Sequence, residues 1–175
     1  MSNGPMRLYL LRHAIAVPHG TPGYTQDAKR PLTDEGRTQA LQVGQGLKRL
    51  KIIPDLVVTS PYLRAAQTAE QVIRVLQPRV PVKELETLRA EAKPSETSAA
   101  LAAFAGHDRL LLVGHEPHLS AWIAELTAGR GGMRCLMRKA GVACVEIERV
   151  PPPAGSGTLR WLLTPKHLTL IGTAP

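Results

Sequence analysis

The sequence predicts one α/β domain, a three-layer α/β/α sandwich with a mostly parallel central sheet flanked by helices. Short apolar runs rich in Leu and Val alternate with segments whose apolar residues recur at helical spacing, as in α/β layered domains. A chain of 175 residues is long enough to bury a core, and neither an internal repeat nor a long linker divides it. We therefore assign residues 1–175 to a single domain.

In the first half, buried strands are expected at residues 8–11 and 56–58, separated by a polar Gly- and Pro-rich loop over 18–31. Thr33 is the expected N-cap of the first helix, because two acidic residues follow it and favour the positive helix end. Ser60-Pro61 is expected to cap and open the second helix, since proline suits the first helical position. Core-facing stripes at helical spacing are predicted for both helices at Ala40, Val43, Leu47 and Leu50, then Ala65, Ala69, Val72 and Leu76.

The second half continues the alternation with four more strands and two helices. The strands are expected at residues 80–83, 110–113, 142–148 and 159–163, the last two flanking a turn over 151–157. One helix is expected from about Ser95 to Phe104. Another should follow Pro117, bury Leu119, Trp122, Ile123 and Leu126, and stop at Gly129.

The composition favours an anionic partner. Lys and Arg number 22 against 14 Asp and Glu, which gives a net charge of +8. The basic residues are scattered and do not alternate with aromatics, so a phosphorylated protein or small phosphorylated metabolite is favoured over nucleic acid.

Cysteine usage and hydropathy indicate the compartment. The two cysteines, Cys135 and Cys144, lack metal-type spacing, and Cys144 lies in an apolar strand pattern typical of a buried thiol. No apolar run approaches the ~20 residues that span a bilayer, and the N-terminus lacks a signal-peptide layout. We expect a cytoplasmic protein with no membrane association.

Charged or titratable residues follow three of the predicted strands. Arg12 and His13 follow the first strand, Arg64 comes shortly after the second, and His115 follows the strand at 110–113. In an open α/β sheet the carboxyl ends of parallel strands line the ligand crevice. If these strands are neighbours, two arginines and two histidines meet in one pocket, which is suited to an anion.

These residue types suit phosphoryl transfer. The planar guanidinium matches phosphoryl oxygens in a bidentate way, and helix N-termini at Pro61 and Pro117 would add backbone N–H donors. An imidazole among cations keeps a lowered pKa and stays neutral. His13 could then attack phosphorus, form a covalent phosphohistidine and release inorganic phosphate to water, with no cofactor or metal.

The motifs around these residues resemble those of the histidine phosphatase superfamily, which includes the phosphoglycerate mutases. The matching segments are Leu11-Arg12-His13, residues 30–36 (RPLTDEG), residues 60–68 (SPYLRAAQT) and Val113-Gly114-His115. Ala14 departs from the family pattern, which has glycine there. The resemblance covers nearly the whole chain. It implies a phosphoglycerate mutase-like fold with His13 as nucleophile, and Arg12, Arg64 and His115 completing the phosphate pocket.

Within that superfamily the chain resembles the small bacterial phosphohistidine phosphatases of signal transduction. Larger members carry a lid-like insertion with a glutamate acid, whereas only residues 77–108 span the corresponding gap here. An open site of this kind suits a protein-borne phosphate. The stretch from Asp27 to Arg30 and the closing residues 161–166 (WLLTPK) are similar to that branch. The similarity implies that Asp27 and Arg30 lie near the phosphate.

The proton donor is left open between Asp27 and Glu91, while Glu116 could orient an imidazole or water. Three other functions also stay open. The first is a phosphatase of small phosphomonoesters, such as sugar or nucleotide phosphates. The second is a non-catalytic module that binds phosphoprotein. The third is a zinc hydrolase whose ligands would be His13, His115 and His118 with Glu116 and Asp27.

Overall fold

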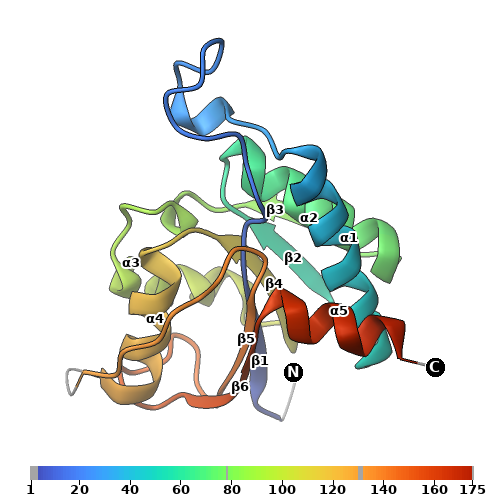
Figure 1. Ribbon diagram of the computed structural model, residues 1–175. Helices are drawn as coiled ribbons and strands as arrows, with labels where there is room; N and C mark the ends of the chain where they lie inside the picture. The colour runs from blue at the N-terminus through green and yellow to red at the C-terminus, as the bar shows by residue number, and fades with distance from the viewer. Residues whose placement is uncertain (1–3, 78, 130–131, 175) are drawn as a thin grey trace.

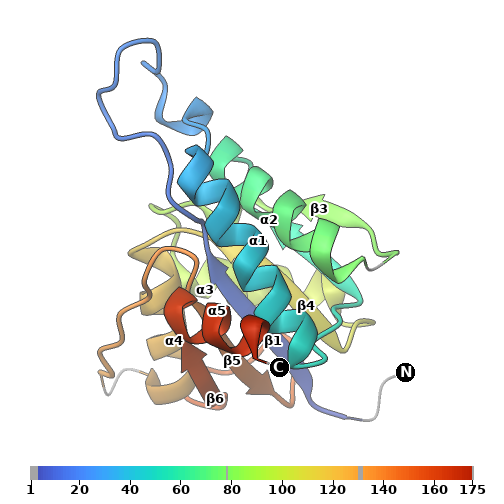
Figure 2. The ribbon, with the colours of Figure 1, turned by 45° about the vertical axis from the view of Figure 1, so that its right-hand side comes forward.

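The computed structural model describes residues 4–77, 79–129 and 132–174. Its strands form one six-stranded sheet, in the order β3 (Val82–Glu84), β2 (Leu56–Thr59), β4 (Arg109–Gly114), β1 (Met6–Arg12), β5 (Val142–Ile147) and β6 (Thr158–Leu163). One face is covered by α1 (Asp34–Arg49), α2 (Leu63–Leu76) and α5 (Pro165–Thr173), the other by α3 (Pro94–Ala100) and α4 (His118–Ala128) (Figures 1 and 2). The predicted three-layer α/β/α sandwich is confirmed.

The directions of the strands correct one part of the prediction. β3, β2, β4 and β1 pair in parallel, but β5 runs antiparallel to both β1 and β6. The sheet is therefore mixed and not mostly parallel. The reason lies in the connections: parallel neighbours need a crossover, usually a helix, whereas only residues 148–157 join β5 to β6 and allow a direct reversal.

Strand β1 shows why these apolar runs form central strands. Leu8 and Leu10 pack in the core beneath α3 and α4, while Tyr9 and Leu11 pack in the core beneath α1, α2 and α5. Successive side chains of a strand point to opposite faces. The sequence of a strand that is covered on both faces is therefore a nearly continuous apolar run.

Several predicted boundaries are confirmed and others are wrong. The Thr33 hydroxyl accepts a hydrogen bond of 3.0 Å from the backbone N–H of Gly36, so Thr33 is the N-cap of α1. Gly129 ends α4 with a positive φ of 60°. The Ser60-Pro61 prediction is wrong: α2 begins at Leu63, because the backbone is still extended at the N-cap Tyr62, with φ of −70° and ψ of 131°.

Two further boundaries shift by a few residues. Strand β3 begins at Val82 instead of residue 80. The helix expected to reach Phe104 ends as α3 at Ala100 and continues as a 3₁₀ turn, Leu101–Phe104.

Helix α5 was not predicted from the sequence. Its start has a recognisable signal, since Thr164 is the N-cap and Pro165 the first helical residue. The helix packs on α1, where Gly46 allows the two backbones to approach closely. A Cβ atom at Gly46 would lie 2.3 Å from the carbonyl oxygen of Leu168. The packing of α5 on α1 therefore also depends on a glycine more than 100 residues earlier in the chain.

The polar loop after β1 projects from the body of the molecule, as the dark-blue segment at the top of Figure 1 shows. An antiparallel bridge between Ala16 and Leu32 closes its base. A 3₁₀ turn, Asp27–Lys29, lies near the returning end. Among the described residues, no helix is long and apolar enough to cross a bilayer.

Candidate active site

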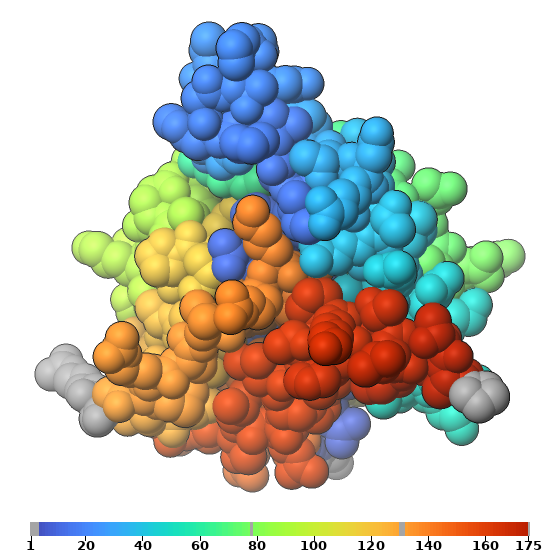
Figure 3. Space-filling model, in the orientation of Figure 1, coloured from blue at the N-terminus to red at the C-terminus, as the bar shows by residue number. Residues whose placement is uncertain are grey.

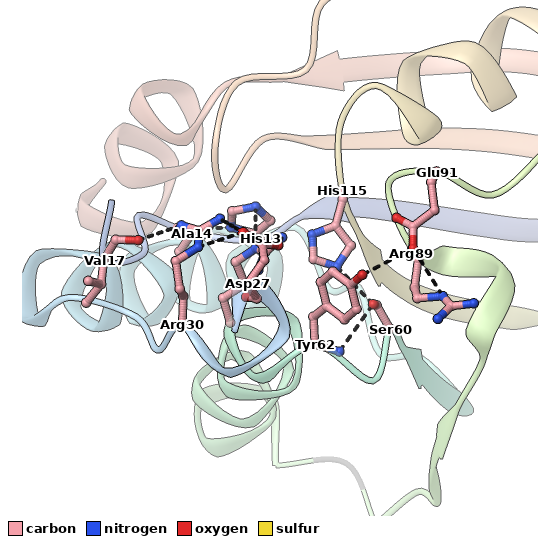
Figure 4. Close-up of polar contacts among 11 residues, drawn as sticks. His13, Ala14, Val17, Asp27, Arg30, Ser60, Tyr62, Arg89, Glu91 and His115 are labelled. Atoms are coloured by element: carbon pink, nitrogen blue, oxygen red, sulfur yellow. Dashed lines mark hydrogen bonds and ion pairs between the residues drawn. The ribbon is translucent and has the colours of Figure 1, made fainter. Parts of the chain in front are cut away.

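Two histidines lie side by side at the carboxyl ends of the central strands. His13 follows β1 and His115 follows β4, and the register of these parallel neighbours places Arg12 opposite Gly114. The backbone N–H of His13 donates to the Gly114 carbonyl at 3.0 Å. The two imidazole ring centres are 5.0 Å apart (Figure 4). The structure thus brings together two residues that are 102 positions apart, as the strand-end argument expects.

The hydrogen bonds of His13 define which ring nitrogen is free to react. Nδ1 lies 2.7 Å from the carbonyl oxygen of Ala14, which can only accept, so Nδ1 carries the proton. Nε2 consequently has the lone pair, and Arg64 Nε donates to it at 3.3 Å. The backbone N–H of Ala14 itself donates to the Thr68 hydroxyl at 3.0 Å, and Ala14 is fully buried.

Burial and surrounding charge keep His13 neutral. The residue is 8% exposed. Burial, together with the positive charges of Arg64, Arg12 and Lys139, lowers the pKa of His13 to about 3, although the Ala14 hydrogen bond works in the opposite direction. An imidazole in this site keeps a nucleophilic lone pair at neutral pH.

Asp27 joins the two arginines that come from different elements. Arg64, in the first turn of α2, donates from Nη1 to the Asp27 carbonyl at 2.8 Å and from Nη2 to Oδ2 at 2.9 Å. Arg30 Nε donates to the other carboxylate oxygen at 2.8 Å. Burial alone would raise the pKa of Asp27, but hydrogen bonds and charge from Arg30 and Arg64 lower it overall. The carboxylate is therefore held ionised and fixes both guanidinium groups.

Two buried nitrogens in this site have no partner among the described residues: Nε of Arg12 and Nδ1 of His115. Arg12 uses Nη1 to donate to the Met137 carbonyl at 2.7 Å. His115, only 1% exposed, has Nε2 at 2.9 Å from the Ser60 hydroxyl oxygen. Burial, then the charges of His13 and Arg64, lower the pKa of His115. Buried polar atoms are nearly always paired in proteins, so these nitrogens are suited to ligand oxygens.

A pocket of about 320 Å³ lies over these groups. Its lining includes five of the residues predicted for the phosphate site: Arg12, His13, Arg30, Arg64 and His115. Asp27 reaches the pocket through the two arginines that it binds.

Glu91 lies apart from the pocket lining. Its side chain is 59% exposed, and Oε1 accepts a hydrogen bond of 3.1 Å from the Tyr62 hydroxyl. Arg89 Nε is 3.5 Å from the same oxygen. Figure 4 shows Glu91 on the far side of Tyr62 from His13.

Sequence reasoning missed Tyr62, which links the pocket to Glu91. Its ring and the His115 ring are tilted by 62° with centres 5.1 Å apart, and the Arg64 guanidinium lies 4.9 Å from the Tyr62 ring centre. A signal was available, because Tyr62 stands two residues before Arg64 in the same motif. His19 and Lys139 also line the pocket, and nothing in the local sequence pointed to them.

One other expectation for this region is corrected and one stays a prediction. Glu116 Oε1 accepts from the backbone N–H of Ser120 at 3.2 Å and Glu116 also lines the pocket, so its role in orienting an imidazole or water stays a prediction. The N–H of Leu119 is bonded to the His115 carbonyl, so these donors of α4 are engaged within the chain. The reason is that the α4 start supplies its own capping group.

The residues suggested as zinc ligands do not lie together in the structure. The nitrogens of His118 lie 3.0 Å from the Thr97 hydroxyl and 3.0 Å from the Ala92 carbonyl, not beside His13. Within the described ranges, no group of three or more His, Cys, Asp or Glu residues is placed to hold a metal ion. Arg64 donates to Nε2 of His13, so its positive charge opposes a cation at that nitrogen.

The chain is similar to known proteins along most of its length. The family model of the histidine phosphatase superfamily (branch 1) matches residues 8–93. An uncharacterised protein of Picosynechococcus sp. is 34% identical over 177 residues, with 93% of this chain and 99% of that protein covered. Phosphohistidine phosphatase SixA of Escherichia coli is 28% identical over 167 residues, covering 94% of this chain and 98% of SixA.

A solved structure gives the same result at the level of the fold. The structure of the protein histidine phosphatase SixA complexed with tungstate superposes with a TM-score of 0.81 and 28% identity, covering 93% of this chain and 99% of that one. Sequence, fold and the pocket at the strand ends therefore agree: the chain is a phosphatase that belongs to the histidine phosphatase superfamily, in its SixA-like branch.

Proposed function

We propose that the chain is a protein phosphohistidine phosphatase in which Nε2 of His13 is the nucleophile. The observation that carries this proposal is the orientation of the His13 ring. The Ala14 carbonyl holds the proton on Nδ1, so the lone pair of Nε2 lies in the pocket beside Arg64. The similar SixA structure is complexed with tungstate, which is an oxyanion like phosphate.

In the first step the phosphoryl group moves to His13. The substrate ring is protonated from solvent on its free nitrogen, so when the bond between phosphorus and the substrate nitrogen breaks and a bond from phosphorus to Nε2 forms, neutral imidazole departs. The Arg64 hydrogen bond to Nε2 is exchanged for one to a phosphoryl oxygen. Arg12 and His115 offer their unpartnered nitrogens to the remaining oxygens. Charge matching of this kind supplies most of the catalysis in phosphoryl transfer.

In the second step water attacks phosphorus and releases inorganic phosphate. Because Nδ1 keeps its proton, the phosphorylated ring is an imidazolium, and neutral imidazole leaves when the bond from Nε2 to phosphorus breaks. Both steps run without a metal ion in this proposal, since Arg12 and Arg64 match the phosphoryl charge. Unchanged turnover after treatment with a chelator is the expected result, and loss of turnover that zinc restores would contradict it.

Asp27 is assigned an ordering role in place of proton donation. Its two hydrogen-bonded arginines lower the pKa of the carboxyl, so it is ionised when the enzyme works. Glu91 then remains as the candidate acid, acting from the edge of the site near Tyr62. A leaving imidazole has an ordinary pKa near 6.5 and needs little help from an acid.

A protein-borne phosphate is favoured by the short segment between α2 and β4. Only β3, two 3₁₀ turns and α3 fill it, with no lid-like insertion among the described residues. The phosphate pocket therefore opens toward a partner's surface. Free thiols at Cys135 and Cys144 fit the cytoplasmic location expected from the sequence.

The test is to compare turnover of a phosphohistidine protein with turnover of sugar and nucleotide phosphates under the same conditions. We expect the phosphohistidine protein to have the highest kcat/KM. A higher value for a small phosphomonoester would support that alternative instead. Tight phosphate binding without hydrolysis of any phosphoramidate or phosphoester would support a binding module.

A further inference from the structure

A second recess, of about 590 Å³, adjoins the phosphate pocket. We call it the basic groove. It is lined by cationic side chains of Arg12, Arg138, Lys139 and Lys166, with Ile15 and Pro165 as apolar contributors. In Figure 3 the chain around residues 132–141 (orange) lies on this face beside α1 (light blue) and α5 (red). Gln39 of α1 also lines the groove, which is thus built from four segments of the chain.

The groove and the phosphate pocket are parts of one surface, because Arg12 and Lys139 line both. Backbone hydrogen bonds fix their relative position. The N–H of Ala140 donates to the carbonyls of Arg12 and His13 at 3.1 and 3.2 Å, and Arg12 Nη1 donates to the Met137 carbonyl. A ligand group in the groove therefore lies at a fixed place relative to His13.

Three cations of the groove make no ion pair among the described residues. Arg138, Lys139 and Lys166 are exposed, and none of the ion pairs among the described residues includes them. No carboxylate is among the residues that line the groove. Two arginines of the phosphate pocket differ in this respect, since Asp27 binds both Arg30 and Arg64.

The position of Lys166 is unfavourable for the helix that carries it. Lys166 is in the first turn of α5, where the helix dipole favours acidic residues, and that turn contains none. Helix stability does not account for a lysine there. An anionic partner does, since the positive end of α5 and the lysine would then both face negative charge.

The sizes of the two recesses indicate which part of a substrate protein each one would bind. A phosphohistidine side chain occupies the pocket of about 320 Å³, and the larger groove is left for neighbouring parts of the same substrate. Building on the proposed function, we propose that the groove binds an acidic segment of the protein that carries the phosphohistidine. Its Asp and Glu side chains pair with Arg138 and Lys166, and its backbone packs on Ile15 and Pro165.

The experiment uses two synthetic phosphohistidine peptides that differ only in a flanking run of glutamates or glutamines. For the native chain we expect kcat/KM to be about tenfold higher for the Glu peptide. The Arg138→Glu and Lys166→Glu variants should each bring the ratio close to one. The matched control is Arg79→Glu, an exposed arginine just before β3, at the opposite end of the sheet, with the same change of charge. It should retain the native ratio.

A binding measurement separates this inference from the proposed function. Unphosphorylated Glu and Gln peptides are titrated against the same four proteins by fluorescence anisotropy. Tighter binding of the Glu peptide to the native and Arg79→Glu proteins only would support the groove, even if neither phosphopeptide is hydrolysed and the proposed function fails. Equal binding of both peptides, or a preference that survives Arg138→Glu and Lys166→Glu, would overturn the inference. Tighter binding of single-stranded nucleic acid than of the Glu peptide would also overturn it.

Discussion

The phosphate pocket and the basic groove share Arg12 and Lys139 but hold their positive charges in opposite ways. In the pocket, Arg64 and Arg30 are fixed by Asp27, and two histidines are buried in their neutral form. In the groove, Arg138 and Lys166 are exposed and make no ion pair among the described residues. Fixed, buried charge is suited to stabilising a transition state. Exposed, unpaired charge is suited to attracting and orienting a partner.

The largest effect is expected from removing the proposed nucleophile in the pocket. His13→Ala should lower turnover of a phosphohistidine protein by ~10⁴-fold or more, because no other group supplies the attacking lone pair. The variant should also fail to accumulate acid-labile phosphate on the enzyme, measured with radiolabelled substrate. His107→Ala is the control, since His107 pairs with Asp55 at the other end of the sheet. Near-normal turnover by His13→Ala would mean that the nucleophile is another residue.

Removing a fixed cation tests whether the pocket depends on preorganised charge. Arg64→Ala should lower kcat by ~10²–10³-fold, because one donor to the transferring oxygens is lost and Asp27 keeps only Arg30 as a partner. Steady-state kinetics on a phosphohistidine peptide gives the measurement. Arg74→Ala, an exposed arginine on the same helix, should change kcat less than about twofold. Similar losses in both variants would show that the effect comes from α2 and not from the pocket.

The buried neutral histidines predict how stability depends on pH. The folded-state pKa of His13 is about 3, below the ordinary value of 6.5, so between these values the unfolded chain takes up a proton that the folded chain excludes. Stability therefore falls as the pH drops below 6.5. Between pH 7 and pH 5.5 the loss attributable to His13 is about 1 kcal/mol.

Urea unfolding at the two pH values measures this loss. His13→Gln should be less sensitive to pH than the native chain by about that amount. Arg138→Gln, a variant in the groove, should follow the native curve, because Arg138 is exposed and makes no ion pair among the described residues. An unchanged pH dependence in His13→Gln would show that the folded protein accepts the proton.

The smallest effect is expected at the edge of the pocket. Glu91→Gln should slow hydrolysis of phosphohistidine less than about threefold, because a departing imidazole needs little acid assistance. It should slow hydrolysis of a sugar phosphate by ~10²-fold if Glu91 protonates the alkoxide. Glu86→Gln is the control, since Glu86 also pairs with Arg89 and belongs to the same segment. Equal small effects on both substrates would remove Glu91 from the chemistry.

Local sequence patterns were sufficient to predict most of the strands and helices that form the layers of the fold. Apolar runs such as Leu8–Leu11 are buried on both faces, so their hydrophobicity alone marks them as central strands. The direction of β5 could not be read in this way, because parallel and antiparallel strands have the same side-chain alternation. The single-domain assignment of residues 1–175 stays a prediction.

The sequence by itself determined which of the candidate site residues come together at the strand ends. Arg12 and His13 directly follow β1, His115 follows β4, and Arg64 lies in the first turn after β2. Parallel neighbouring strands end at the same edge of a sheet, so this convergence needed only the correct strand prediction. The roles of Asp27 and Glu91 could not be decided from sequence, since the state of a carboxyl depends on its neighbours in space.

Only the tertiary structure decided what surrounds the phosphate pocket. The basic groove combines residues 12–15 with residues 138–139 and 165–166, which meet because β5 and β6 reverse direction and return α5 to α1. Tyr62 joins the site because α2 begins two residues later than its proline suggested. A local pattern reports which face of an element is buried. It does not report which distant cations share a surface, because their proximity depends on the packing of the whole chain.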